Sequence, residues 1–520
     1  MWRFCRRIAR GCHAGLVLAT VLMAATWLFL LHQSWKQVSF VKHPDGIPNG
    51  PLASGEDKDR SSRRSTSGSP TTSAPPFLTP AFVMDSFPSA VAVEDWQSSA
   101  MYSSTKLRLF IYSAYVDTRV RGASVRVIGV YGSLTREPIS CRLEYEDGSW
   151  RVVPAEKSTV NEHWKLKYAA VFFVCPYPPG LSPPAYVRLK ETRDHHWTPP
   201  VPVRPSGTLK GHPVGRIAAC IKPLHYNYHR ATWLVEFIEF HRHIGIEHFF
   251  FYNHSTAADV DKVLTAYQND KVATVLPWTL AVRSQKEIRT EGLFAALNDC
   301  MYRTMHHFDY MATLDLDEFF VLRRDDNLND LIARVKGNTV LSSFVFRNVF
   351  FYLYWPNDTT AYGAPPETEP QNIPYLLTQY KTRRSTTVFR VGSRSKYIVA
   401  PTTAVEAGNH IVWKFAAVPL SHSPSSNASD INRLKPSRTF FARRSKVRHG
   451  NKGISPDDAL LHHYRICEYG GYDCLKRPSV VDRTALRFNA SLLSRVTDVC
   501  RKAFPETQRC PQAPPLGSPW

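Results

Sequence analysis

The chain has 520 residues, of which 43% are hydrophobic and 12% aromatic, and its 65 Lys and Arg against 44 Asp and Glu give a formal charge of +21 at pH 7. This hydrophobic content excludes a disordered protein, and the length exceeds what one core usually organises, so we expect more than one folded unit. The charge alone would suit a nucleic-acid binder, but the N-terminal features argue against that class.

The N-terminus contains an uncharged apolar stretch, Ala14 to Leu31, which as a helix is just long enough to cross a bilayer. Four arginines precede it, so the positive-inside rule predicts a cytosolic tail over residues 1–13 and a lumenal location for the rest of the chain. A cleaved signal peptide is the alternative, but the stretch is long for one and bulky Trp35 follows it. We therefore expect a single-pass type II membrane protein. Because its folded part would lie in the lumen, away from DNA and RNA, this topology argues against nucleic-acid binding.

Residues 32–92 are rich in Pro, Ser and Thr, with SSRRSTSGSPTTSAPP at their centre. Such a composition cannot bury a core, and it predicts an extended stem.

Cysteine and asparagine patterns agree with a lumenal, oxidising compartment. Eight cysteines follow residue 100 and none forms a CxxC pair, which favours disulfides over a zinc ribbon. The nearest neighbours give the expected pairs: Cys141 with Cys175, Cys467 with Cys474, and Cys500 with Cys510. Sequons for N-glycosylation occur at Asn253, Asn357, Asn427 and Asn489.

Residues 93–197 contain short segments of alternating apolar and polar residues, rich in Val, Ile, Tyr and Phe and separated by turn residues. This pattern predicts a small antiparallel β-sandwich. The Pro-rich residues 198–213 are typical of a domain linker.

From residue 214 to 510 strands and helices alternate, which favours an α/β domain with a mostly parallel sheet covered by helices, before a flexible tail at 511–520. The expected strands cover residues 216–222, 248–252, 271–278 and 310–315, and the expected helices cover 231–244, 258–269 and 286–306. The chain contains neither GxGxxG after the first strand nor GxxxxGK[ST], so dehydrogenase and P-loop functions lose their main support.

Asp315 and Asp317 follow directly on the apolar strand YMATL. Ligands of open α/β sheets bind at the carboxyl ends of strands, and two carboxylates there can hold a divalent ion that bridges a nucleotide diphosphate. A DxD triplet is common by chance, and surface acids at a strand end are the alternative.

Several motifs together resemble glycosyltransferase family 92, the former DUF23 group. They are ACIKPLHYN, LVEFIEFHRHIGIEHFFFYNHS, LNDCMYR, LDLDEFF and LLHHYR, and the similarity covers residues 216–495. The resemblance implies a GT-A-like domain, manganese dependence, inversion at the anomeric carbon and a β-1,4-galactosyltransferase activity with UDP-galactose on glycoprotein glycans in the Golgi membrane. Plant members carry a preceding β-sandwich that resembles a carbohydrate-binding module, so the sandwich here is a candidate counterpart.

The resemblance also implies roles for individual residues. Asp315 and Asp317 would be metal ligands, with a third ligand from His463 or, as the alternative, His462, and Glu318 would orient them. Candidates for nucleotide-sugar binding are Asn298, Asp299 and Lys396. The general base that an inverting displacement needs is not identified, and its candidates are His410, Glu406 and Asp430.

Packing, capping or surface roles remain open for each of these residues outside the Asp pair. Two other functions also remain open: transfer from a different UDP-sugar, and a non-catalytic, lectin-like membrane glycoprotein.

Overall fold

The computed structural model describes residues 95–98, 107–119, 122–178, 180–204, 215–337, 341–358, 360, 374–417, 449–468 and 471–511. The predicted cytosolic tail, apolar segment and stem lie outside these ranges, as do Asn427, Asp430 and nearly all of the predicted C-terminal tail. Among the described residues, no helix is both long enough and apolar enough to span a bilayer.

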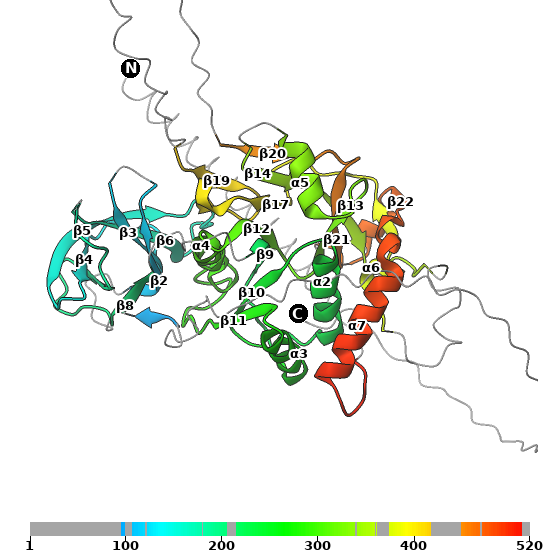
Figure 1. Cartoon of the computed structure of the whole chain (residues 1–520), viewed down its shortest axis with the longest axis horizontal. Coiled ribbons are helices and arrows are strands. Elements are labelled where there is room, and N and C mark those ends of the chain that lie inside the picture. Colours follow the sequence, from blue (N-terminus) through cyan, green and yellow to red (C-terminus); the bar gives the residue numbers. More distant parts are fainter. Residues whose placement is uncertain are drawn as a thin grey trace, which may run out of the picture. The chain divides into compact units, whose positions relative to one another are not determined.

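The first folded part is built only of strands (Figure 1). They are β1 (Gln97–Ser98), β2 (Phe110–Asp117), β3 (Ser124–Gly132), β4 (Ile139–Glu144), β5 (Trp150–Thr159), β6 (Tyr168–Pro176), β7 (Tyr186–Glu191) and β8 (Val201–Arg204). The hydrogen-bonded order is β1-β2-β3-β6-β5-β4-β7-β8, and a further pairing of β8 with β2 closes seven of the strands into a ring.

This ring corrects the predicted sandwich. Alternation along a strand is the same in a sandwich and in a barrel, because both bury one face of every strand. The difference rests on the parallel pairing of Ala114 with Val203 and of Tyr115 with Arg204, which joins the first and last strands of the ring. The strand β8 also lies within the residues 198–213 that were expected to be a linker.

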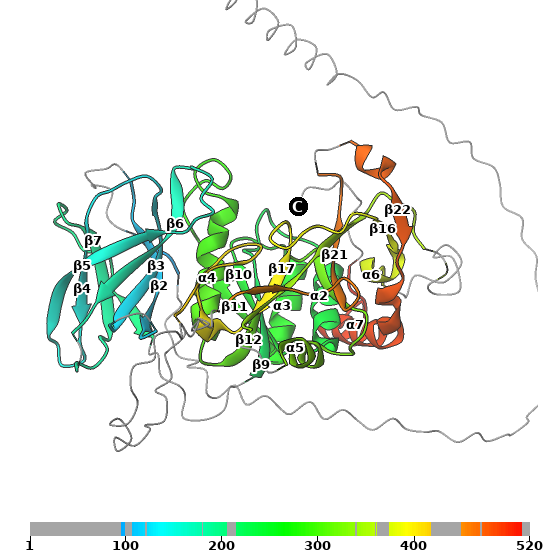
Figure 2. The same ribbon diagram turned by 90° about the horizontal axis from the view of Figure 1, so that it is seen from above.

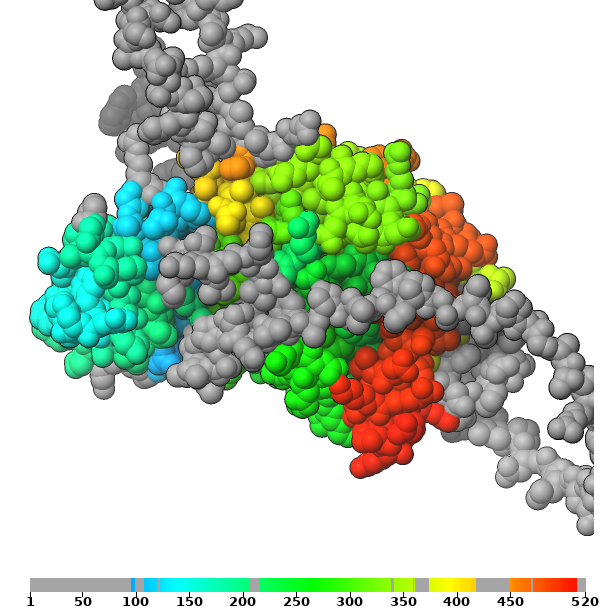
Figure 3. All heavy atoms as spheres, viewed as in Figure 1, coloured from blue at the N-terminus to red at the C-terminus, as the bar shows by residue number. Residues whose placement is uncertain are grey.

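The second part is organised by a seven-stranded sheet of order β11-β10-β9-β12-β17-β14-β20. Its strands are β9 (Gly215–Ile221), β10 (His248–Asn253), β11 (Ala273–Pro277), β12 (Phe308–Leu314), β14 (Ser343–Phe346), β17 (Lys396–Val399) and β20 (Asn451–Gly453). The helices are α2 (Ala231–His243), α3 (Ala258–Asn269), α4 (Leu293–Thr304), α5 (Leu328–Lys336), α6 (Leu377–Tyr380) and α7 (Asn489–Ala503). Figure 2 shows α2, α3 and α4 alongside the strands, and α7, in red, forms part of the surface in Figure 3.

Smaller sheets complete this part. They contain β13 (Glu318–Leu322) with β21 (Ala459–Arg465) and β15 (Asn348–Tyr352), β16 (Arg383–Ser385) with β22 (Ser479–Val481), and the hairpin β18 (Ala404–Ala407) and β19 (Val412–Phe415).

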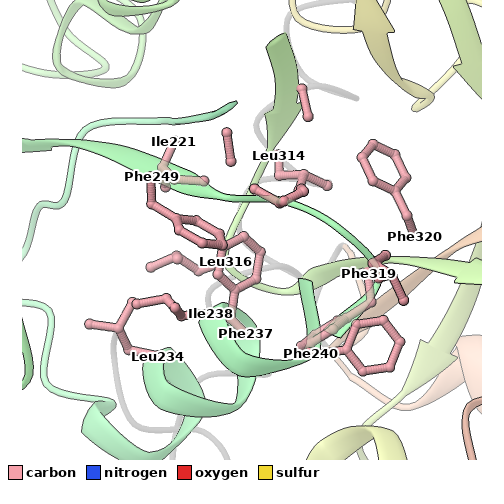
Figure 4. Packing of buried hydrophobic residues seen from close by; sticks show 14 of the residues in the cluster. Ile221, Leu234, Phe237, Ile238, Phe240, Phe249, Leu314, Leu316, Phe319 and Phe320 are labelled. Atoms are coloured by element: carbon pink, nitrogen blue, oxygen red, sulfur yellow. The ribbon is translucent and has the colours of Figure 1, made fainter. Parts of the chain in front are cut away.

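The central strands are buried on both faces. Along β9, Ile217, Ala219 and Ile221 pack into one hydrophobic core with α2, whereas Ala218 and Cys220 pack into another with α4. Figure 4 shows the first core, where Leu234, Phe237 and Ile238 of α2 meet Ile221 and Phe249. The second core also contains barrel residues, so the barrel and α4 share one packed interior. We call this contact the seam.

The predicted fold class, a GT-A-like α/β domain with a mostly parallel sheet, is wrong for this structure, whereas the predicted membrane helix lies outside the described residues. The described residues are rich in sheet, with 36% strand and 23% helix, and they contain a closed seven-stranded barrel. The large sheet is parallel from β11 to β12 and again between β14 and β20, whereas β17 runs antiparallel to both of its neighbours. The strands that follow residue 317 are short, and their sequences lack the long periodic pattern that identifies the earlier elements.

Candidate functional site

The site is built where two neighbouring strands end. Leu314 of β12 pairs with Ile221 of β9, so the residues that follow them, Asp315 and Lys222, are brought together. The Lys222 Nζ atom lies 3.4 Å from the Asp315 Oδ2 atom. The strand sequence therefore positions a cation beside the first carboxylate.

A second cation reaches Asp315 from β17. The Lys396 Nζ atom lies 3.2 Å from Asp315 Oδ1 and donates to Asn409 Oδ1 at 2.7 Å. Burial alone would raise the pKa of Asp315, but the positive charges of Lys222 and Lys396 outweigh it and hold that pKa below its ordinary value. Asp315 is therefore ionised, and the structure brings the predicted residue Lys396 to the site.

Glu318 begins β13, opposite His463 of β21. Its carboxylate accepts a hydrogen bond from the Asp315 backbone N–H at 3.0 Å and lies 3.6 Å from Lys396 Nζ. Burial and the neighbouring acids raise the pKa of Glu318 to about 7, although Lys396 opposes this shift. We call Asp315, Asp317 and Glu318 the acidic cluster.

His463 faces this cluster. Its Nε2 atom lies 3.2 Å from Asp317 Oδ2, and its Nδ1 atom lies 3.4 Å from Glu318 Oε1 and 3.0 Å from the Asn348 side-chain nitrogen. His462, the neighbouring residue on the same strand, is fully buried against Phe351, and burial lowers its pKa to about 3. Of the two histidines, only His463 shares the site with Asp317.

The donor atoms fit a divalent ion. The Asn348 Oδ1 atom is buried without a partner while the amide nitrogen faces His463 Nδ1. Turning this amide lets Oδ1 accept a hydrogen bond from the Nδ1–H group of His463, and the lone pair of Nε2 then points toward Asp317. A carboxylate and an imidazole held in this way are suitable metal ligands.

No group of three or more His, Cys, Asp and Glu side chains in the described ranges is already arranged to hold an ion.

A pocket that is open to solvent lies beside Asp317. Its lining consists of Lys222, Pro223, Leu224, His225, Tyr228, Arg230, Trp233, Leu316 and Asp317. Lysine and arginine suit a diphosphate, and aromatic side chains suit a base or a ribose. The guanidinium of Arg230 stacks on Trp233 at 4.2 Å, which places a cation and an aromatic ring on the same wall.

The other two predicted nucleotide contacts are used by the fold instead. The Asn298 side chain donates to the Ala407 carbonyl at 3.0 Å and accepts from the Ala407 N–H at 2.8 Å, which ties α4 to β18. Asp299 is completely buried in the seam, where it accepts hydrogen bonds from the hydroxyls of Tyr115 and Tyr252, each at 2.6 Å. Neither residue lines the pocket beside Asp317, and their predicted role in nucleotide binding stays a prediction.

The base candidates lie in different surroundings. The His410 Nδ1 atom lies 3.0 Å from the Ser395 carbonyl, and burial together with the charge of Lys396 lowers its pKa to about 4, so the imidazole is neutral at physiological pH. Glu406 is fully buried and accepts a hydrogen bond from the Asn161 N–H at 3.2 Å. Asp430 lies outside the described residues.

Lys222 and Glu291 also border the site, although the sequence-based predictions gave neither residue a role. Lys222 could have been found from its place directly after the first strand, which matches that of Asp315 after β12. Glu291 lies in a turn, Thr290–Gly292, whose residues all have positive φ, and its buried Oε2 atom lies 3.8 Å from Nε2 of the pocket residue His225. Only the structure reveals this backbone.

The three expected disulfides are confirmed, and the other two cysteines of the described residues, Cys220 and Cys300, form a fourth that joins β9 to α4. Of the described sequons, Asn357 is exposed, whereas Asn253 and Asn489 are half-buried.

Residues 215–479 match the model of glycosyltransferase family 92. The protein also resembles the β-1,4-galactosyltransferase galt-1 of Caenorhabditis elegans, with 25% identity over 227 residues. This match covers 41% of the chain and 51% of the relative, so it spans about half the length of that protein. Among solved structures, an amylomaltase from Corynebacterium glutamicum shares 14% identity over 24% of this chain and 19% of its own, with a TM-score of 0.10 that supports no conclusion about the fold.

Proposed function

Because the chain belongs to glycosyltransferase family 92, we propose that it transfers galactose from UDP-galactose to a glycan of a glycoprotein, with inversion and formation of a β-1,4 linkage. The acidic cluster beside a cationic and aromatic pocket is the observation that carries this proposal. The name of the nematode relative supports the choice of galactose and of the linkage.

The proposal includes a manganese ion, which Asp317 and His463 would hold, with Asp315 alongside. When bound, such an ion neutralises the charge that develops on the diphosphate as the sugar departs. Oxygen and imidazole donors are compatible with Mn²⁺.

Basic side chains of the protein can also bind the charged groups of the donor. Lys222 and Arg230 line the pocket on the Asp317 side, where they can bind the diphosphate and orient the donor. Lys396 keeps Asp315 ionised and, through Asn409, fixes the position of the β18–β19 hairpin. These contacts hold the nucleotide while the sugar end stays open to an acceptor.

His410 is the base candidate that the surroundings favour. A neutral imidazole can take the proton of the attacking hydroxyl, whereas Glu406 is sealed in the interior. If His410 is the base, the acid limb of the pH–rate profile falls near pH 4, and His410→Gln flattens that limb.

We also propose that the enzyme resides in the Golgi membrane with its folded part in the lumen. The four disulfides support an oxidising compartment, and the uncharged segment from residue 14 to 31 supports attachment to a membrane.

The test is to incubate the purified protein with Mn²⁺, each common UDP-sugar and galactose-terminated or fucose-bearing glycans, and to analyse the product by NMR. A β-1,4-linked galactose is expected. An α-linked product or a clear preference for another UDP-sugar would replace the proposed specificity. Glycan binding without transfer from any donor would favour the lectin-like alternative.

A further inference from the structure

A loop of the barrel reaches the hairpin that lies next to the acidic cluster. In this loop, between β5 and β6, the Glu162 Oε1 atom accepts hydrogen bonds from the Asn409 backbone N–H at 3.2 Å and from the Trp413 indole N–H at 2.5 Å. The adjacent Asn161 N–H donates to Glu406 at 3.2 Å. The barrel therefore contributes the Glu162 side chain to the contacts that hold the β18–β19 hairpin.

Glu162 is connected to the acidic cluster through two side chains. Asn409 receives the hydrogen bond of Lys396 Nζ at 2.7 Å, and the same Nζ atom lies 3.2 Å from Asp315 Oδ1. Asn409 thus contacts Glu162 with its backbone and Lys396 with its side chain. Two residues, Asn409 and Lys396, therefore link Glu162 to Asp315.

Two large aromatic side chains at this place face solvent. The ring of Trp413 is held by Glu162, yet the residue is 41% exposed, and Trp164 on the barrel loop is 65% exposed. Trp164 and the next residue, Lys165, have φ angles of 55° and 56°, a left-handed conformation that costs on the order of 1–3 kcal/mol for each residue without a glycine. The Arg289 guanidinium lies 4.8 Å from the Trp164 ring and helps to hold it.

Gly408 allows this arrangement to form. A Cβ atom at this position would lie 2.2 Å from the Trp413 indole nitrogen and 2.7 Å from Glu162 Oε1. The backbone therefore approaches the Glu162–Trp413 pair more closely than any other residue type would permit.

We propose that Glu162 and Trp413, flanked by Trp164, form a subsite for the acceptor glycan, in which one pyranose ring stacks on the Trp413 indole and donates a hydroxyl hydrogen bond to Glu162. The proposal rests on the glycosyltransferase function proposed above. The C–H face of a pyranose is apolar and packs well on an indole. Both hydrogen bonds that the described residues supply to Glu162 end on Oε1, so Oε2 can accept one from a sugar.

The subsite gives the barrel a part in catalysis. It does not touch the pocket beside Asp317, since none of its residues lines that pocket. Acceptor binding and donor binding should therefore respond to different substitutions.

The experiment compares Trp413→Ala, Trp413→Phe and Glu162→Gln in the full-length protein. We expect the acceptor KM to rise at least about tenfold for Trp413→Ala and less for Trp413→Phe, which keeps a ring. The donor KM and the slow hydrolysis of donor without acceptor should stay within about twofold, because no donor contact changes. Trp150→Ala is the matched control, since this residue is 55% exposed on the barrel and should leave both KM values unchanged.

The outcomes separate the two proposals. If the unmodified protein transfers no sugar, the proposed function fails. If it transfers sugar but all three variants keep the acceptor KM, or if donor KM rises as much as acceptor KM, the subsite is refuted while the function stands. If Trp413→Ala does not fold, the acceptor KM values of Trp413→Phe and Glu162→Gln still test the subsite. Their melting temperatures show whether these two variants are folded.

Discussion

Carboxylates in the seam between the barrel and α4 have partners unlike those in the acidic cluster. In the seam, Asp299 receives two tyrosine hydroxyls and the guanidinium of Arg303, whose nitrogen lies 3.0 Å away. Asp117 likewise receives Arg119 at 3.0 Å and Arg126 at 3.1 Å. Both carboxylates are almost wholly enclosed and fully paired.

The acidic cluster differs because three acids share two lysines and one histidine, and because Asp317 borders the pocket. Here the acids are close enough to repel one another, and burial raises the pKa of Glu318 to about 7. A buried carboxylate whose charge is matched by neighbouring cations indicates a structural role. Several carboxylates that lie close together beside a pocket indicate a binding site. The comparison predicts that the same substitution has opposite consequences in the two regions.

Asp317→Asn should have the largest effect on activity. It removes a predicted metal ligand, so we expect turnover to fall by a factor of at least about a hundred, as when a group that stabilises transition-state charge is lost. The melting temperature should change by only a few degrees because one of three crowded acids becomes neutral. Near-native turnover, or activity that EDTA leaves unchanged, would refute the metal assignment.

Asp299→Asn should have the largest effect on stability. The change removes the buried charge that pairs with Arg303 in the seam, and breaking a buried pair in this way typically costs about 3–5 kcal/mol. Urea denaturation measures this loss, and activity per folded molecule should be retained. If the variant is as stable as the unmodified protein but inactive, the result would instead support a role of Asp299 in nucleotide binding.

Asp117 should give a smaller, pH-dependent effect. Burial would raise its pKa, but hydrogen bonding and the charges of Arg119 and Arg126 lower it from 3.8 to about 2. A lowered pKa stabilises the fold above the ordinary value, so about 2 kcal/mol should be present above pH 4 and be lost as the pH falls through 2. Unfolding measured between pH 2 and 5 should show this slope, and Asp117→Asn should remove it. Asp498→Asn, an exposed acid, should leave the slope intact.

Asn357→Gln should have the smallest effect, since this exposed residue belongs to neither region. Mass spectrometry should show the loss of one N-glycan, and both turnover and melting temperature should stay unchanged. An unaltered mass would mean that the sequon is unused.

Most elements between residue 214 and Asp315 could be predicted from the sequence because they have a long and regular pattern, although the helix expected at 286–306 covers only Leu293–Thr304. The helix expected at 258–269 occupies those residues, and the strand expected at 248–252 is one residue longer. The site at the end of β12 follows from the same pattern, since the carboxylates come directly after the buried run. Local sequence therefore places Asp315 and Asp317.

What could not be predicted depends on partners far away in the chain. Asp299 looks like a site residue until Tyr115, 184 residues earlier, is seen to bind it. His462 and His463 are adjacent on one strand, so alternation puts them on opposite faces without telling which face meets Asp317. Closure of the barrel is likewise a matter of pairing between distant segments.

The β2–β8 pairing that closes the barrel also sets an order of events during synthesis. The ribosome delivers the chain from its N-terminus, so all the strands of the ring exist before α4 is made. If the ring closes as soon as its strands are complete, the hydroxyl of Tyr115 lies on a folded surface before Asp299 is made, and the barrel can serve as a template for the domain that follows it. Damage to the ring should be seen first as newly made transferase that is retained and degraded, before any change in the kinetics of the molecules that mature.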